Sequence, residues 1–372
     1  MKDRIAQRRR TMNVLALNSG SSSFKFGLYR VDAAGVQTLL TESVDSAGHV
    51  DATARVVQAL ARPELPAPDA VGHRIVHGGP MLRRHCLIDD TVLRQLEAAA
   101  AFAPLHMPAA LTLIRDAQQR FPGLPQVACF DTRFHADLPD VARVLPIAKA
   151  LQAQGIQRYG FHGLSLESIV RQLGADLPQR VVIAHLGNGA SVTAVKGGRS
   201  VDTSMGLTPT GGLIMGTRSG DLDPGVLLHL LRERQFDAVR LEALVDHGSG
   251  LLGISGVSSD MRRLHEAAAS NPDARLAIEM FCYAVRKQIA AMIAVLDGID
   301  LLVFTGGIGE NDAPVRAAIC SGLSWIGVSL DEFRNSAASN PIHDGASRCV
   351  VRVLESQEDE QIARHAWALV AA

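Results

Sequence analysis

Four short segments rich in glycine and serine carry the residues best suited to bind phosphate. Each lies next to an apolar stretch typical of a β-strand, and glycine lets backbone N–H groups approach phosphate oxygens closely. One such turn is weak support for a nucleotide site, whereas four together supply the several contact points that a nucleotide needs. The segments span residues 18–23, 186–191, 210–220 and 305–311.

Histidine, arginine and aspartate gather in four further short motifs. An arginine fork binds carboxylate or phosphoryl oxygens in pairs, so these motifs could hold a small anionic substrate. Taken singly, each histidine or arginine also fits a structural hydrogen-bonding role. The motifs are GHRIVHGG (72–79), FDTRFH (130–135), YGFHG (159–163) and GTRSGDLDP (216–224).

Three common site types are disfavoured by the motifs. The chain has no GxxxxGK[ST] segment, so it is not an ordinary Walker-type ATPase. The GGIGEN run at 306–311 lacks the GxGxxG spacing of a nicotinamide enzyme. His73 and His77 lie four residues apart, but Ile75 and Val76 between them favour a strand and the glutamate of an HExxH zinc motif is missing.

The composition describes a globular chain without a strong charge bias. Its 372 residues contain 37 Lys and Arg against 38 Asp and Glu, so nucleic acid and anionic membranes are not expected partners. No apolar run reaches the roughly 18 residues that span a bilayer. The 5 cysteines contain no CxxC pair, which argues against a zinc site or a disulfide framework and predicts a cytoplasmic protein.

The predicted elements alternate as in α/β proteins. An apolar strand at 14–17, a Gly/Ser turn and an alternating strand at 24–31 are repeated in layout at 180–195, which suggests a duplicated domain. Asp89 and Asp90 begin one predicted helix that stops at Pro104, and Asp273 begins a longer one that runs to Gly298. A buried strand at 301–304 then leads into a glycine turn and a helix from Pro314, which places a ligand beyond the end of that strand.

In combination, the motifs resemble the acetate kinase family, within the superfamily of acetate and sugar kinases, heat-shock chaperone ATPases and actin. They match in order from residue 14 to residue 311 and form a specific set. The matching motifs are NSGSSSFKF, GHRIVHGG, APLH, FDTRFH, YGFHG, HLGNGAS, DTSMGLTP, GTRSGDLDPG and FTGGIGEN.

The resemblance implies an α/β fold of two duplicated ribonuclease H-like domains, as in actin-like ATPases, facing each other across a cleft. The expected N-terminal domain comprises residues 12–147 and 361–372, and the expected C-terminal nucleotide-binding domain comprises residues 148–360. Residues 1–11 are expected to be a disordered basic extension. The family also implies a homodimer.

The resemblance also assigns the residues of the reaction. It places Asp131, His162 and Arg218 in catalysis and Arg74 on the substrate carboxylate. Because a carboxylate is already ionised at neutral pH, Asp131 is better regarded as an organiser of metal or water than as an obligatory base. The residues implied around the substrate methyl group are Val76, Leu105, Phe161 and Pro209.

The nucleotide and metal ligands follow from the same comparison. Asn18 and Glu358 are implied as ligands of Mg²⁺, with Mn²⁺ as an alternative metal and Asp359 as an alternative to Glu358. Lys25 is implied near the phosphates of ATP. The remaining ATP-binding residues are His185, Leu186, Gly187, Asn188, Gly189, Asp260, Met261, Arg262, Gly307, Ile308, Gly309, Glu310 and Asn311.

The activity implied is that of an acetate kinase, an ATP-dependent carboxylate phosphotransferase that converts ATP and acetate reversibly into ADP and acetyl phosphate. Propionate or butyrate kinase is the alternative within the class, and a noncatalytic actin-like ATP-binding protein is the alternative outside it. The noncatalytic alternative would have lost Arg74, Asp131, His162 and Arg218, all of which are present. Arg133, Met107, Leu164 and Leu166 depart from the family pattern on the substrate side, which leaves the preferred carboxylate open.

Overall fold

The computed structural model describes residues 11–20, 23–45, 52–104 and 106–371. The chain forms two compact units, each with its own sheet. The first unit comprises the chain up to Ala136, Gly163–Ser168 and Gln357–Ala372, and the second comprises Asp137–His162 and Ile169–Ser356. The units are defined by the contacts within the folded chain. The two domains expected from the sequence, 12–147 with 361–372 and 148–360, remain a prediction.

The sheet of the first unit has the strand order β3-β2-β1-β4-β6-β5. Its first strands form an antiparallel meander, while β4 and β6 continue parallel to β1. The predicted strand pair around the NSGSSS turn is β1 and β2, with Asn18 opposite Lys25. The strands are β1 (Met12–Ser19), β2 (Ser23–Val31), β3 (Val36–Asp45), β4 (Ala70–Ile75), β5 (Cys86–Leu87) and β6 (Gln126–Phe130).

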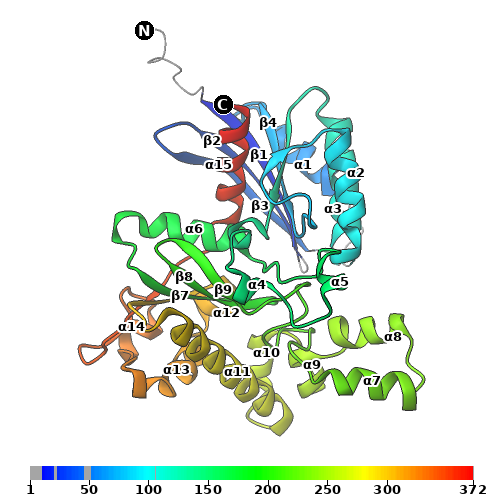
Figure 1. The fold of residues 1–372 in the computed structure, drawn as a ribbon. Coiled ribbons are helices and arrows are strands. Elements are labelled where there is room, and N and C mark those ends of the chain that lie inside the picture. Colours follow the sequence, from blue (N-terminus) through cyan, green and yellow to red (C-terminus); the bar gives the residue numbers. More distant parts are fainter. Residues whose placement is uncertain (1–10, 21–22, 46–51, 105, 372) are drawn as a thin grey trace. The chain divides into compact units, whose positions relative to one another are not determined.

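Helix α15 (Glu358–Val370) packs on this sheet although it comes last in the sequence (Figure 1). Its Ile362, Ala366 and Trp367 join a core cluster with Val14 and Val127 of the strands. Gly72 of β4 permits this contact, because a Cβ there would lie 2.6 Å from Ile362. The other helices of the unit include α1 (Ala52–Leu60), α2 (Asp90–Ala99) and α3 (Met107–Arg120).

A buried histidine links the middle strands of this sheet. His73 of β4 contacts the Oε1 atom of Gln126 in β6 through its Nε2 atom at 2.6 Å. Burial lowers the pKa of His73 to about 4, although the hydrogen bond to Gln126 opposes the shift. The native state therefore holds this imidazole neutral, whereas the unfolded chain binds a proton near pH 6.5.

Acid is therefore expected to destabilise the protein through His73. Because the folded pKa is depressed, the stability contribution is complete above pH 6.5 and is lost as the pH falls towards 4, by about 3 kcal/mol. Urea unfolding at pH 7 and pH 4.5 measures the loss. His73→Gln keeps a hydrogen-bonding nitrogen without the titration and should lose less stability than the wild type; an equal loss in both proteins would contradict the prediction.

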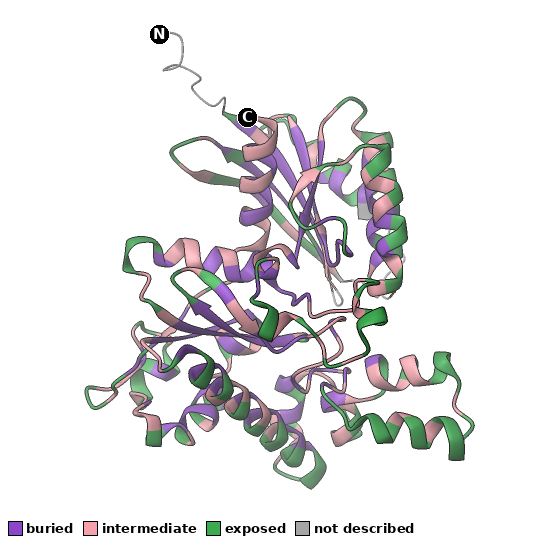
Figure 2. Ribbon diagram, in the orientation of Figure 1, coloured by how far each residue is buried: buried purple, intermediate pink, exposed green. Residues whose placement is uncertain are grey.

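The second unit repeats the topology of the first. The strand order of its sheet is β11-β10-β7-β8-β9. Strands β7, β8 and β9 form an antiparallel meander, and β10 and β11 extend the sheet parallel to β7. The inner strands of both sheets are largely buried, whereas the outer strands β3 and β5 of the first unit are mostly half-buried or exposed (Figure 2). The strands are β7 (Arg180–Leu186), β8 (Ala190–Lys196), β9 (Arg199–Thr203), β10 (Leu301–Thr305) and β11 (Val350–Val353).

Helix α11 (Pro272–Leu296) covers this second sheet, as its apolar spacing predicts. Asn271 caps it by accepting hydrogen bonds from the backbone of Asp273 and Ala274, so the helix begins one residue before the predicted Asp273. The other helices are α4 (Asp140–Arg143), α5 (Lys149–Gln152), α7 (Pro224–Glu233), α8 (Ala238–Glu242), α9 (Gly250–Ser255), α10 (Met261–Ala267), α12 (Gly306–Asn311), α13 (Ala313–Ser321) and α14 (Glu332–Ser336).

The structure corrects two predicted element boundaries. The segment predicted as a glycine turn at 305–311 forms helix α12, which begins directly after β10 at Gly306. Gly306 has a φ of 78°, a value open to glycine, so the chain turns there in a single residue. The helix predicted to run to Pro104 ends at Ala99, and a 3₁₀ turn at Ala100–Phe102 follows.

Within the described part of the chain, no helix is both long enough and apolar enough to cross a membrane. The predicted basic extension, apart from Thr11, and Leu105 lie outside the described residues.

Candidate active site

The predicted substrate arginine lies in a buried polar cluster of the first unit. Asn18 is near the end of β1, Arg74 lies in β4 and Asp131 follows β6, and these three strands are parallel. Because the carboxyl ends of parallel strands meet at one edge of the sheet, residues 56 and 57 positions apart come into contact.

The guanidinium of Arg74 is held by both neighbours. Its Nε and Nη2 atoms donate to Oδ2 of Asp131 at 2.9 and 2.6 Å, and Nη1 donates to Oδ1 of Asn18 at 3.1 Å. A guanidinium has five N–H groups, so two are left without a partner among the described residues. These groups can bind a carboxylate while the other three hold the side chain in place.

Asp131 is fully buried. Burial raises its pKa to about 6; Arg74 works against the shift, and the nearby charge of Glu358 adds to it. Its second oxygen, Oδ1, is buried and has no hydrogen-bond partner in the described part of the chain. A buried carboxylate with one unsatisfied oxygen is suited to hold a cation or an ordered water molecule.

The first turn of α15 adds two more carboxylates to this cluster. Asn18 donates through Nδ2 to Oε2 of Glu358 at 3.1 Å and to Oδ1 of Asp359 at 2.7 Å. Burial and the adjacent Glu358 raise the pKa of Asp359, while Asn18, Lys25 and Arg74 oppose the shift. Carboxylate and amide oxygens are the donors that Mg²⁺ prefers, so the residues present fit a divalent cation.

His162 and Arg218 come together in the second unit. They converge on Gly189, where a Cβ would lie 2.8 Å from Nη2 of Arg218 and 3.1 Å from Nε2 of His162. The ring of His162 stacks on His185 with centroids 4.1 Å apart. Glycine at position 189 therefore allows both side chains to approach the turn between β7 and β8.

Further contacts fix the orientation of both catalytic candidates. Nδ1 of His162 lies 2.9 Å from Oγ of Ser191, and Nη1 of Arg218 donates to the backbone oxygen of Pro209 at 2.7 Å. His162 has a φ of 60° and directly precedes α6 (Gly163–Leu173). Such a left-handed conformation is uncommon outside glycine and is concentrated at functional sites.

Comparison with known proteins decides the family. The sequence profile of the Acetokinase family matches residues 34–364. The acetate kinase of Methylocella silvestris is 41% identical, over 96% of this chain and 98% of the relative. The acetate kinase of Nitrobacter hamburgensis is also 41% identical, over 96% of each chain. The chain belongs to the acetokinase family.

Solved structures agree with this acetokinase assignment. A crystal structure of a propionate kinase from Francisella tularensis has a TM-score of 0.87 and 36% identity, covering 96% of this chain and all of the other. The Porphyromonas gingivalis acetate kinase has a TM-score of 0.82 and 33% identity, with the same coverage. The predicted family, the α/β fold with a duplicated topology and the kinase class are therefore confirmed.

Apart from Lys25, which lies in β2 of the first unit, the predicted ATP-binding residues of this acetokinase lie in three places of the second unit. His185 and Leu186 end β7, residues 187–189 form the following turn, and residues 307–311 lie in α12. Thr305 pairs with His185 in the parallel register, which places the start of α12 and the turn after β7 at the same end of these two strands. Asp260 caps the start of α10 by accepting from the backbone and side chain of Arg262.

One of these residues has a structural role. The carboxylate of Glu310 accepts hydrogen bonds from Gly306 N at 2.8 Å and Ser356 N at 2.9 Å. Arg316, buried in α13, donates to the backbone oxygens of Gly309 and Glu310. Both side chains hold the backbone of α12 in position.

Three residues of the site escaped the sequence-based assignment or stood only as an alternative. Ser191 contacts His162 and closes the HLGNGAS motif, so its place in that motif was the available signal. Asp359, considered only as an alternative to Glu358, contacts Asn18 together with it. Nothing in the spacing around Arg316 distinguishes it from a surface arginine.

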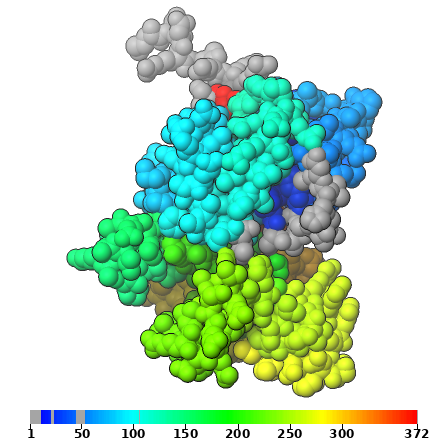
Figure 3. Space-filling view, turned by 90° about the vertical axis from the view of Figure 1, so that its right-hand side faces the viewer, coloured from blue at the N-terminus to red at the C-terminus, as the bar shows by residue number. Residues whose placement is uncertain are grey.

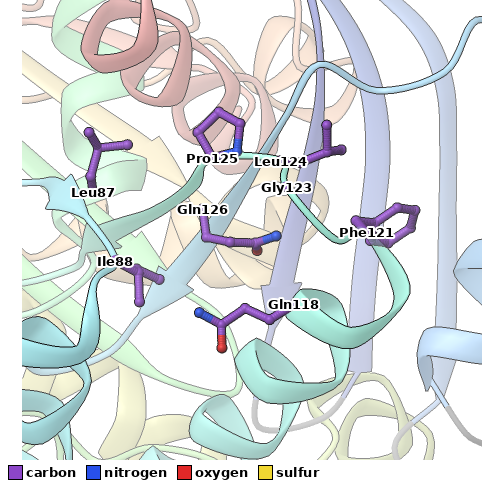
Figure 4. Close-up of a pocket in the computed structure, with 8 residues that line it drawn as sticks. All are labelled: Leu87, Ile88, Gln118, Phe121, Gly123, Leu124, Pro125 and Gln126. Atoms are coloured by element: carbon purple, nitrogen blue, oxygen red, sulfur yellow. The ribbon is translucent and has the colours of Figure 1, made fainter.

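The residues predicted to surround the substrate methyl group are described within each unit separately. Val76 follows β4 and is buried, and Phe161 and Pro209 are buried in the second unit. A pocket of about 400 Å³ lies elsewhere in the first unit (Figure 4). None of the predicted site residues lines it; its lining is Leu87, Ile88, Gln118, Phe121, Gly123, Leu124, Pro125 and Gln126.

Proposed function

We propose that this acetokinase transfers the γ-phosphoryl group of ATP to acetate, giving ADP and acetyl phosphate reversibly. The observation that carries the proposal is the buried Asn18–Arg74–Asp131 cluster, whose arginine keeps two N–H groups for a ligand. That arrangement suits a small carboxylate, which needs to be oriented but not deprotonated.

Arg74 binds the acetate carboxylate, and Asp131 and Asn18 hold the arginine in place. Restricting the guanidinium before binding lowers the entropy lost when acetate binds. Asp131 is fully buried and bonded to Arg74 through one oxygen, so it acts on the arginine and the cation rather than as a base. The ionised acetate oxygen is itself the nucleophile towards phosphorus.

Asn18, Asp131, Glu358 and Asp359 would hold Mg²⁺, or Mn²⁺ in its place. When bound, the cation neutralises charge on the phosphate oxygens during transfer. The orphaned Oδ1 of Asp131 and the crowding of carboxylates around Asn18 support this assignment.

Arg218 and His162 stabilise the phosphoryl group as it moves. Phosphoryl transfer depends mainly on positioning and on neutralising the charge spread over the equatorial oxygens. Both side chains lie against Gly189, in the turn proposed to bind ATP. ATP is proposed to contact that turn, Lys25, the start of α10 (Asp260, Met261 and Arg262) and α12 (residues 307–311).

Acetate is proposed as the substrate, with propionate as the alternative, because the similar Francisella tularensis protein is a propionate kinase. Val76, Phe161 and Pro209 are proposed to contact the methyl group, together with Leu105. Apolar walls discriminate weakly, because one methylene contributes only about 1 to 3 kcal/mol. We therefore expect kcat/KM for propionate to be about 10- to 200-fold below that for acetate.

Val76→Ala is expected to narrow the gap between acetate and propionate. The substitution removes volume beside the methyl group and leaves Arg74 to hold the carboxylate. The ratio of kcat/KM for the two substrates, measured in wild type and variant, tests this. An unchanged ratio would show that Val76 does not contact the substrate, and a wild type that prefers propionate would refute the acetate assignment while leaving the carboxylate kinase.

A hydroxylamine-trapping assay tests the activity. Acyl phosphate formed from ATP, magnesium and a carboxylate reacts with hydroxylamine to give a coloured hydroxamate. Acetate should give the fastest reaction in a panel with propionate, butyrate and formate. No hydroxamate with any carboxylate would refute the proposed function.

A homodimer is proposed on the surface of α7. This helix carries Val226, Leu228 and Leu231, yet none of its residues is buried. The segment around α7 and α8 lies on the face shown in Figure 3. Leu228 and Leu231 are three residues apart and share one side of the helix, and exposed apolar side chains that lie together mark association surfaces. Analytical ultracentrifugation tests this proposal. The wild type should sediment as a dimer and Leu228→Glu as a monomer, and a monomeric wild type would contradict the proposal.

A cytoplasmic location is proposed from the free state of Cys86, Cys129, Cys282, Cys320 and Cys349. Cell fractionation with an antibody against the protein tests it, and recovery in a membrane or secreted fraction would contradict it.

A further inference from the structure

Three side chains form a second polar cluster in the first unit, separate from the proposed site. Glu167 lies in α6, His365 in α15, and His85 just before β5. Oε2 of Glu167 is 2.5 Å from Nε2 of His365 and 3.8 Å from Nε2 of His85. The side chains are only 10% (His85), 17% (Glu167) and 23% (His365) exposed.

By spacing alone this cluster resembles a metal site, since its ligand atoms lie within 4.8 Å of one another. The protonation of His85 argues against it. Nδ1 of His85 accepts a hydrogen bond from the backbone N–H of Phe130 at 3.0 Å, so the neutral ring carries its proton on Nε2. Burial lowers the pKa of His85 and keeps the ring neutral. The atom that faces Glu167 is therefore a proton donor and not a free lone pair.

The cluster is instead a carboxylate that accepts a hydrogen bond from His365, while the Nε2 atom of His85 faces it at 3.8 Å without a hydrogen bond in the described part of the chain. Burial alone would raise the pKa of Glu167, but the hydrogen bond from His365 and the nearby imidazole of His85 lower it to about 2. Because an ionised carboxylate only accepts hydrogen bonds, His365 donates through Nε2. Gln361, one turn before His365, lies 3.5 Å from the same carboxylate oxygen. Glu167 thus contacts two successive turns of α15.

The neighbouring residue holds the start of the same helix. Oγ of Ser168 accepts a hydrogen bond from the backbone N–H of Gln357 at 3.1 Å. Gln357 precedes α15 and makes no side-chain cap of its own. Ser168 and Glu167, which are consecutive in α6, therefore contact the start of α15 and its second turn.

The position of α15 matters because its first turn carries Glu358 and Asp359. Both carboxylates lie beside the amide nitrogen of Asn18 in β1, at 3.1 and 2.7 Å, so their place at the end of the sheet depends on how α15 is set against it. His365 lies seven residues after Glu358, on the same side of the helix. The apolar residues Ile362 and Ala366 hold α15 on the sheet, and the polar contacts with α6 set its rotation and its position along the axis.

We propose that Glu167, held by His365, is a positioning residue that orients the acidic first turn of α15 for binding the divalent cation. This inference rests on the proposed metal role of Glu358 and Asp359. Partners outside the ligand shell typically change metal affinity by about 10- to 100-fold. Glu167→Gln replaces the acceptor by an amide that also presents hydrogens to the imidazole N–H groups, so it should weaken the cation site by that factor.

The test measures Mn²⁺ binding directly, from the electron paramagnetic resonance signal of free Mn²⁺ titrated into the full chain. Glu167→Gln and His365→Ala should bind Mn²⁺ about 10- to 100-fold more weakly than wild type. His365→Gln, whose amide nitrogen can replace Nε2, should recover most of the affinity. In steady-state assays the activation constant for Mg²⁺ should rise in parallel while KM for acetate stays unchanged.

Glu360→Gln is the matched control. It removes a carboxylate from the same helix turn as Asp359 and breaks the pair with Arg364, which lies outside the cluster. If Mn²⁺ affinity simply follows the total negative charge, Glu360→Gln will lose as much as Glu167→Gln, and the proposal is wrong. Thermal melting of every variant identifies any that does not fold, and the His365 pair then carries the comparison.

The remaining outcomes separate this inference from the proposed function. Equal Mn²⁺ affinity in wild type and Glu167→Gln would refute the positioning role alone. A wild type that binds no Mn²⁺ would refute the metal assignment, and this inference with it. If Zn²⁺ raises the melting temperature of the wild type but not of His365→Ala, the cluster is a metal site after all and the positioning role is overturned.

Discussion

Arg218→Ala is expected to lower kcat by on the order of 10³-fold or more, as for arginines that stabilise the charge of a transferring phosphoryl group. ATP binding should change far less, because the proposed nucleotide contacts of the turn after β7 and of α12 remain. Steady-state kinetics give kcat, and the binding of a fluorescent ATP analogue gives the nucleotide affinity.

Two further variants make the Arg218 result specific. Arg218→Lys keeps the charge but loses the fork that contacts the Pro209 carbonyl, so it should recover only part of the rate. Arg275→Ala removes an exposed arginine of α11 in the same unit and should leave kcat unchanged. If Arg218→Ala lowers ATP affinity as much as it lowers kcat, the residue binds ATP in the ground state and the role proposed for it is wrong.

Arg74→Ala is expected to raise KM for acetate by about 100-fold or more, since it removes two charge-assisted hydrogen bonds. The same substitution should destabilise the protein by about 3–5 kcal/mol, because Asp131 is left buried without its charged partner. Urea unfolding measures the second effect, and kinetics at saturating ATP measure the first.

A double variant separates these two consequences of losing Arg74. Replacing both partners, as in Arg74→Ala with Asp131→Asn, removes the unpaired charge and should restore part of the stability. Acetate binding should not recover, because no arginine is present to bind the carboxylate. If acetate KM returns towards the wild-type value, Asp131 repelled the substrate in the single variant and Arg74 is not its ligand.

The duplicated fold could be predicted from the chain because the pattern of each half is locally complete. A strand, a small-residue turn and an alternating strand occur at the start of both halves. The structure shows the same order of five strands in both sheets, and the first sheet adds β5 at its edge. The boundary of α12 could not be predicted in the same way. Glycine is a poor helix former, and the short helix depends on contacts from Glu310 and Arg316 that only the folded chain supplies.

Most residues of the proposed site could be predicted from the polar motifs, but the hydrogen bonds between those residues could not. Arg74 was assigned to the carboxylate, whereas its hydrogen bonds to Asp131 and Asn18 depend on the alignment of three strands. Ser191, Asp359 and Glu167 act through neighbours that are distant in sequence or belong to other elements. Such contacts leave no periodic signal, because they follow from topology rather than from local spacing.

The central claim is that an oxygen of the acetate carboxylate itself forms the bond to the transferred phosphorus. Phosphorus NMR of the acetyl phosphate made from ATP and ¹⁸O-labelled acetate tests it directly. Direct attack keeps a labelled oxygen in the bridge between carbon and phosphorus, so the product resonance should show the isotope shift of ¹⁸O bound to phosphorus. Acetyl phosphate without that shift, or phosphate released from ATP with no acetyl phosphate formed, would contradict the account.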